Sequence, residues 1–196
     1  MRNFIQRLKS MLEPLPAEMK WGVWLGLLTA SSVAFSLSLA CATPFAALVT
    51  LAALNMERRN ALTVTVTVWL ANQAVGFGFL HYPQTFDSYA WGIAIGVAAA
   101  VALWTAMELA RRMQPAGAFI ETIIAFAGAF VTYEVLLYMT AFLLPGSEGA
   151  FSWPIVRWVL LINLLALTGL LALHRVASTL GLAGQRPISV ATAATS

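Results

Sequence analysis

Long apolar runs separated by short polar breaks make up most of the chain. Four of them, residues 61–80, 89–110, 117–144 and 155–173, are each long enough to cross the roughly 30 Å core of a bilayer as a helix. A fifth run, from Trp21 to Leu54, would form a helix about 50 Å long and therefore has to break. Pro44 cannot continue a helical hydrogen-bond ladder, and it pushes the residue before it out of helical geometry.

The break near Pro44 predicts two further segments, 21–39 and 44–56, and so six membrane spans in all. Within the third span, the stretch "TVTVTV" at 63–68 alternates like a β-strand. A lone strand would leave its backbone groups unpaired in lipid, so we interpret this stretch as helix. Residues 3–12 predict a short interfacial helix before the first span. Its apolar and basic residues lie on opposite sides: Phe4, Ile5, Leu8, Met11 and Leu12 against Arg7 and Lys9.

Composition supports a membrane protein and excludes an ordinary soluble domain. The chain is 60% hydrophobic and only 10% charged, with a mean hydropathy of +0.81, whereas a soluble domain has roughly half apolar and a quarter charged residues. The net charge of +3 does not indicate a nucleic-acid partner, because the basic residues stand beside the ends of the apolar runs rather than in one patch.

The basic residues instead predict the topology. With the N-terminus in the cytoplasm and six spans, ten of the 11 Lys and Arg residues fall on the inner side, and only Arg157 falls outside. We therefore predict an all-α, multi-pass protein of a bacterial cytoplasmic membrane with both termini cytoplasmic. The predicted parts are an interfacial segment (1–19), a six-helix membrane domain (20–177) and a cytoplasmic tail (178–196).

Cys41, the single cysteine, stands three residues before Pro44 in "SLSLACATPFAAL". A lipoprotein or signal-peptide cleavage site fits poorly, because another apolar segment follows instead of a polar tether. Three roles remain open for the thiol: a small apolar packing residue at the bend, a soft ligand to a metal-bearing molecule such as a cobalt cofactor, or a redox group.

Polar side chains gather at one level, in the halves of the spans that this topology places outside. Glu134 is the most telling, since a carboxylate at membrane depth is costly unless it is protonated, paired or in a wet cavity. We expect Arg157 to be its partner, either in a structural pair between the last two spans or at the edge of an outward-facing polar cavity. The amides at similar depth favour the cavity. The candidate binding residues are Cys41, Asn72, Gln73, His81, Tyr82, Asp87, Glu134, Tyr138, Arg157 and Asn163.

Small residues recur every four positions along two spans. Gly22, Gly26, Ala30 and Ala34 form such a stripe on the first span, and Gly92, Gly96 and Ala100 form another on the fourth. Stripes of this kind let a second helix approach closely in lipid. The first stripe predicts a docking face for a partner or a tight neighbour within the fold.

These features resemble the substrate-binding S component of energy-coupling factor transporters. The resemblance rests on six spans in about 200 residues, both termini inside, the "ASSVA" segment within the first stripe, and an outward polar pocket. It covers Trp21 to His174. It implies uptake of a vitamin or similar micronutrient, and docking of an ATPase-coupled membrane subunit through the face that holds Ala30 and Ala34. Some members of the family carry cobalamin and contact cobalt through a cysteine sulfur, a part that Cys41 could take.

Two other classes of function stay open. One is a noncatalytic assembly or anchor subunit, for which the small-residue stripes would suffice. The other is a quinone- or haem-associated redox subunit, although His81 and His174 fall at opposite faces in this topology. No HExxH motif, P-loop or nucleophile elbow occurs, so we expect no enzyme activity, no resident metal and no cofactor apart from cobalamin as a transported ligand.

Overall fold

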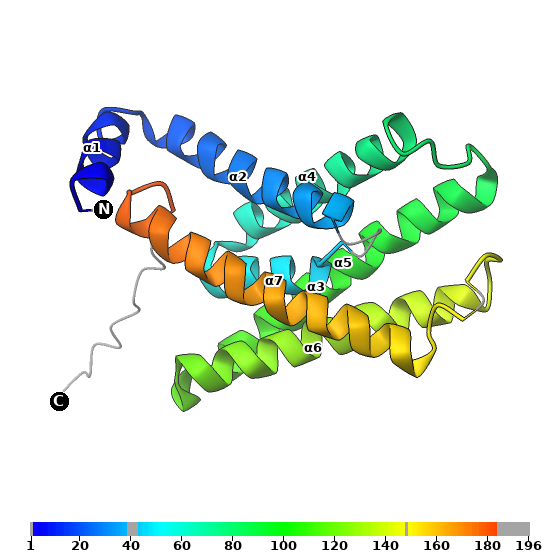
Figure 1. Ribbon diagram of the computed structural model, residues 1–196. Coiled ribbons are helices and arrows are strands. Elements are labelled where there is room, and N and C mark those ends of the chain that lie inside the picture. Colours follow the sequence, from blue (N-terminus) through cyan, green and yellow to red (C-terminus); the bar gives the residue numbers. More distant parts are fainter. Residues whose placement is uncertain (1, 39–42, 148, 184–196) are drawn as a thin grey trace.

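A bundle of helices makes up the computed structural model, which describes residues 2–38, 43–147 and 149–183. No strand occurs in these ranges. The elements in chain order are α1 (Arg2–Leu12), α2 (Ala17–Ser38), α3 (Phe45–Asn55), α4 (Arg58–Gly78), α5 (Phe86–Met113), the 3₁₀ turn η1 (Gln114–Ala116), α6 (Ala118–Ala141) and α7 (Trp153–Thr179). The predicted interfacial segment is a helix, α1, and the "TVTVTV" stretch lies inside α4, which confirms both assignments as helix (Figure 1).

Among the residues that the structure describes, four helices are long and apolar enough to cross a membrane: α4, α5 extended by η1, α6 and α7. The structure is therefore that expected of an all-α, multi-pass membrane protein. The segment predicted at 44–56 is shorter than a span. Its helix, α3, has 11 residues and so reaches only about 16 Å, half of a hydrocarbon core.

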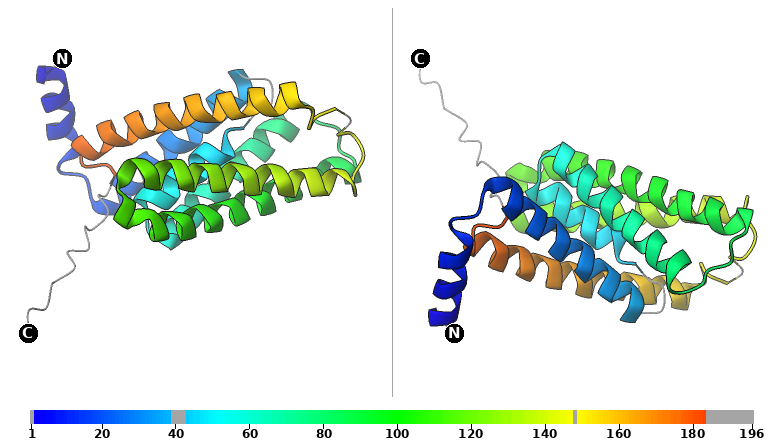
Figure 2. Two further views of the ribbon diagram at one scale, coloured as in Figure 1. Left: turned by 90° about the horizontal axis from the view of Figure 1, so that it is seen from below. Right: turned by 90° about the horizontal axis from the view of Figure 1, so that it is seen from above.

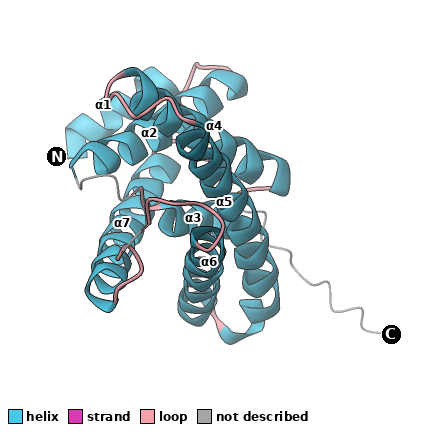
Figure 3. Ribbon diagram, turned by 90° about the vertical axis from the view of Figure 1, so that its right-hand side faces the viewer, coloured by secondary structure: helices cyan, strands magenta, loops and turns pink. Residues whose placement is uncertain are grey.

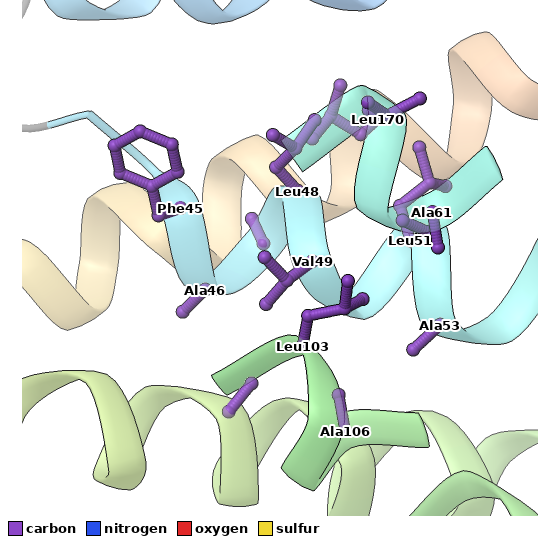
Figure 4. Packing of buried hydrophobic residues seen from close by; sticks show 14 of the residues in the cluster. Phe45, Ala46, Leu48, Val49, Leu51, Ala53, Ala61, Leu103, Ala106 and Leu170 are labelled. Atoms are coloured by element: carbon purple, nitrogen blue, oxygen red, sulfur yellow. The ribbon is translucent and has the colours of Figure 1, made fainter. Parts of the chain in front are cut away.

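Helix α3 is the centre of the bundle. It packs against α4, α5, α6 and α7, and every residue from Phe45 to Ala53 is buried. In the surrounding core Val49 points towards Leu103 of α5, whereas Leu48 points towards Leu170 of α7 (Figure 4). Leu51 lies beside Ala61 of α4 (Figure 4). The alanines on α5 and α6 allow close approach, and these two helices form the most extensive pair in the bundle. In the end-on view, α3 lies between α7 and α6 (Figure 3).

The connecting segments divide between the two ends of the bundle. One end, here called the loop end, carries residues 79–85, 142–147 and 149–152 (Figure 2). The other, here called the basic end, carries α1, the α3–α4 turn, η1 and the end of α7 (Figure 2). Two arginine pairs, Arg58 with Arg59 and Arg111 with Arg112, lie at the basic end because α4 begins there and α5 ends there. Arg157 lies in the second turn of α7, towards the loop end. This distribution is the one that the positive-inside rule predicts for a basic end in the cytoplasm.

Candidate functional site

The first turn of α3 begins inside the bundle and lacks a capping side chain of its own. Its N-cap residue is Pro44, which forms no side-chain capping hydrogen bond. Asn163 on α7 supplies the acceptor instead, because its Oδ1 accepts a hydrogen bond from the backbone N–H of Ala47 at 3.2 Å. The other half of the amide is also satisfied, since Nδ2 donates to the carbonyl oxygen of Val159 at 3.0 Å. Asn163 is only 3% exposed, so a side chain from a distant helix completes the buried end of α3.

A second amide, on α4, contacts the chain just before Pro44. The hydroxyl of Thr43 donates to Asn72 Oδ1 at 3.3 Å, and Asn72 Nδ2 donates to the carbonyl oxygen of Val68 at 2.9 Å. From α6, the ring of Tyr133 packs on the ring of Phe45 with centroids 5.9 Å apart. Three helices thus place polar or amphipathic groups around the buried start of α3, where the helix dipole gives the first N–H groups a partial positive charge.

The start of α3 lies well below the loop end. Asn72 comes six residues before the last residue of α4 and Asn163 comes ten residues after the first residue of α7, so the two amides lie about 9 and 15 Å along their helices from that end. The predicted residues Asn72 and Asn163 are therefore brought to one site. Cys41, which the sequence places on the same connection, lies outside the described residues.

Four other predicted residues lie in the connection between α4 and α5 or in the helix ends beside it. Gln73 lies against α5, where its Oε1 is 2.6 Å from the position that a Cβ on Gly92 would take. The ring of Tyr82 covers Gly76 in the same way, because its Cε2 lies 2.6 Å from the position that a Cβ on Gly76 would take. His81 is exposed and adopts a positive φ of 55°, and Asp87 stands in the first turn of α5, where a negative charge favours the helix. These contacts explain the four residues as turn, packing and helix-terminus groups.

Glu134, Tyr138 and Arg157 lie on the α6 and α7 side of the bundle. Glu134 is half-buried. Two residues earlier, Thr132 donates a hydrogen bond to Thr105 of α5 at 3.3 Å, and a step of two residues turns a helix by about 200°. Glu134 therefore points away from α5. Within the described residues no ion pair joins Glu134 to Arg157, which is exposed, so the expected pair does not form.

Tyr138 borders a cavity of about 360 Å³ at the loop end. Its ring meets the edges of two phenylalanine rings, Phe142 at 5.0 Å and Phe151 at 5.4 Å. Ser147 and Ser152 add hydroxyl groups to the lining. Tyr138 stands four residues after Glu134, one turn nearer the loop end, so this cavity and the carboxyl group lie along the same helix.

The two small-residue stripes have different surroundings. On α5, Gly92 and Gly96 leave room for α4 side chains, because a Cβ at Gly96 would lie 2.7 Å from the Trp69 ring. On α2, Gly22, Gly26, Ala30 and Ala34 are all exposed. Nothing lies within 4 Å of the positions that a Cβ on Gly22 or Gly26 would take. The stripe on α5 is therefore used within the fold, whereas the stripe on α2 faces outward.

The two histidines lie far apart. His81 is in the connection at the loop end, and His174 is near the other end of α7, where its ring lies 5.6 Å from that of Trp24. One haem cannot be held by both. Sequence reasoning missed the contacts of Thr43 and Ala47, although a proline at the start of a buried helix is a signal that another element must supply the cap.

Comparison with protein-family models, with curated proteins and with solved structures gives no match.

Proposed function

We propose that this chain is a membrane transport protein that binds a small solute beside the start of α3 and takes it up from the loop end. The observation that carries this proposal is α3 itself, a helix of 11 residues that begins inside the bundle with amides from α4 and α7 at its first turn. Transporters use such half-length helices to hold a solute within the membrane, with the N-terminal end facing an anionic group. A vitamin or micronutrient that carries a carboxylate or phosphate fits this chemistry.

The loop end supports an entry route. The cavity beside Tyr138 opens there, and Glu134 lies one turn further along α6, away from α5. A half-buried carboxyl group without an ion pair among the described residues is typical of a solute or proton pathway rather than of a structural staple. In this proposal the solute enters beside Tyr138 and moves towards Asn72.

Six spans, cytoplasmic termini and the likeness to S components belong to the same proposal. Helix α2, with 22 residues, would supply the first crossing, and the short helix α3 would lie within the second. A coupling subunit would dock on the exposed stripe of α2. Cobalamin remains one candidate ligand, with Cys41 as the group that would contact its cobalt.

Binding to the purified chain tests the proposal. Native mass spectrometry of protein isolated in mild detergent would detect a copurified solute, and titration with a panel of vitamins, cobalamin included, would then measure affinity. The variant Asn72→Leu should weaken binding at least tenfold, because loss of a hydrogen bond to a charged ligand costs about 1.5–3 kcal/mol. Asn60→Leu, on the same helix at the basic end, is the matched control and should bind as the wild type does. Equal affinities for all three proteins would refute a site at the start of α3.

A second function, assembly of a membrane complex, is favoured by one observation. The stripe on α2 is exposed, with open space beside Gly22 and Gly26. If this is the main role, the protein should copurify with a stoichiometric partner chain and no solute. Gly26→Leu should then release the partner, whereas Ala127→Leu, on an exposed position of α6, should not.

A further inference from the structure

A groove between α4 and α5 opens on the outside of the bundle. It has a volume of about 240 Å³ and is walled by Val66 and Trp69 on one side and by Ile93 and Val97 on the other. The three aliphatic residues in these walls are between 41% and 60% exposed. Gly96 makes the groove possible, because its missing side chain leaves room for the Trp69 ring.

The polar groups along the groove are already satisfied. Trp69 Nε1 donates to the carbonyl oxygen of Gly92 at 2.8 Å, and the Thr65 hydroxyl donates to the carbonyl oxygen of Ala61 at 2.9 Å. The groove therefore offers an occupant apolar contact and no free donor, which suits a hydrocarbon chain.

A cation lies beyond the groove, nearer the basic end. The Arg58 guanidinium carbon lies 4.1 Å from the centre of the Trp104 ring. Trp104 stands one turn after Ala100, the last residue of α5 that lines the groove. Arg58 and Arg59 are both exposed, and the ion pairs among the described residues are those of Glu108 with Arg111 and Arg112. Neither arginine therefore forms an ion pair among the described residues, and both lie on α4 nearer the basic end than the groove. The groove together with the surface from Ala100 to Arg58 is here called the valley.

The distance along α4 from Arg58 to Trp69 matches the thickness of one leaflet of the hydrocarbon core. Trp69 comes eleven residues after Arg58, so the two side chains lie about 16 Å apart along α4, close to half of a 30 Å hydrocarbon core. A phosphate at Arg58 would let an acyl chain run down to Trp69. A partner helix is about 10–12 Å across, so a groove of about 240 Å³ would receive side chains of such a helix rather than the helix itself.

We propose that the valley between α4 and α5 is a binding site for an anionic phospholipid of the leaflet at the basic end. Its phosphate lies at Arg58 and Arg59, and one acyl chain lies against Trp69 and Gly96. Basic clusters beside membrane helices on the cytoplasmic side bind anionic headgroups in this way. The site is separate from the proposed solute site and does not depend on the transport function.

Native mass spectrometry of the full chain tests the site, with equal amounts of phosphatidylglycerol and phosphatidylcholine that carry the same acyl chains. The wild type should retain phosphatidylglycerol preferentially. The double variant Arg58→Gln/Arg59→Gln should reduce that preference by about fivefold for each arginine, whereas Arg157→Gln/Arg175→Gln, with the same change of charge on α7, should leave it intact. An unchanged preference in the first double variant would overturn the headgroup site.

The acyl chain needs a test of its own. Ala100→Leu should fill the groove and lower retention of both lipids, while Ala127→Leu on α6 should not. Equal retention by these two variants would overturn the acyl site. Capture of a second, stoichiometric protein chain that Ala100→Leu displaces would also overturn it, since the occupant would then be a helix. All four variants lie on the surface or at the groove, so melting temperatures near that of the wild type are expected.

Discussion

Replacement of Asn163 by leucine should destabilise the bundle by about 2 kcal/mol. Asn163 accepts the hydrogen bond of the Ala47 N–H at 3.2 Å. Leucine keeps the branched shape and the number of heavy atoms, but it is larger and has no acceptor. The residues on both sides of this bond are buried, with Asn163 3% and Ala47 0% exposed, so water cannot take over. A buried donor left unpaired costs about 1–3 kcal/mol, and single hydrogen bonds in membrane proteins reach about 1.7 kcal/mol.

Asn55→Leu is the matched control, at the other end of α3. Its Nδ2 donates to the carbonyl oxygen of Leu51 at 2.9 Å, a carbonyl that the helix ladder already engages. No buried group loses its only partner, so we expect a loss below about 0.5 kcal/mol.

The assay is unfolding of the purified proteins in dodecyl maltoside with increasing SDS, followed by helical circular dichroism. The midpoint for Asn163→Leu should fall clearly below those of the wild type and of Asn55→Leu. Equal midpoints for the two leucine variants would mean that the amide of Asn163 does not cap α3, and the central place of that bond in the site would be refuted.

Three further outcomes follow from the packing. Gly96→Ala should destabilise the bundle by about 1–3 kcal/mol, because the new Cβ would lie 2.7 Å from the Trp69 ring. Gly26→Ala, with open space around it, should instead stabilise the isolated chain by up to about 1 kcal/mol. The same SDS titration measures both variants, and stability changes of the same sign would contradict the packing described here. Thr132→Val should lower the stability of the bundle by only about 0.6 kcal/mol, since the Thr105 hydroxyl keeps its hydrogen bond to the Val101 carbonyl oxygen. A loss of stability above about 2 kcal/mol would contradict this and would mean that Thr132 belongs to a larger hydrogen-bond network. In a Cys41→Ala background, Gln84→Cys and Ser147→Cys should react with a membrane-impermeant maleimide in intact cells, and Gln114→Cys only after lysis; labelling of all three from one side would rule out the proposed topology.

Much of the fold could be predicted from the sequence because lipid leaves few choices to the backbone. Apolar runs of span length have to be helical, so the helical assignment of "TVTVTV" at 63–68 followed from the environment even though its alternation favours a strand. Pro44 marked the break in the long first run for an equally local reason, the loss of a hydrogen-bond donor. The two arginine pairs beside the ends of apolar runs likewise lie at helix ends in the structure.

The candidate site was only partly predictable. Asn72 and Asn163 were predicted as site residues because amides within apolar runs are unusual, and their shared position near the start of α3 depends on how α4 and α7 pack around it. Glu134 and Arg157 were expected to pair because they fall at similar depth, but depth does not specify direction around a helix axis. The two glycine stripes look alike in sequence, and only their neighbours separate the one on α5 from the one on α2.

The sequence by itself determined which segments are helical, where the first run breaks and which ends are basic. Each of these depends only on neighbouring residues in the chain and on the lipid or water around them. Only the tertiary structure decided that α3 is a buried half-length helix, that Asn163 caps it, and that the α2 stripe faces outward. Those features depend on the rotation and separation of helices that lie far apart in the chain, and van der Waals packing between side chains, rather than local propensity, determines both.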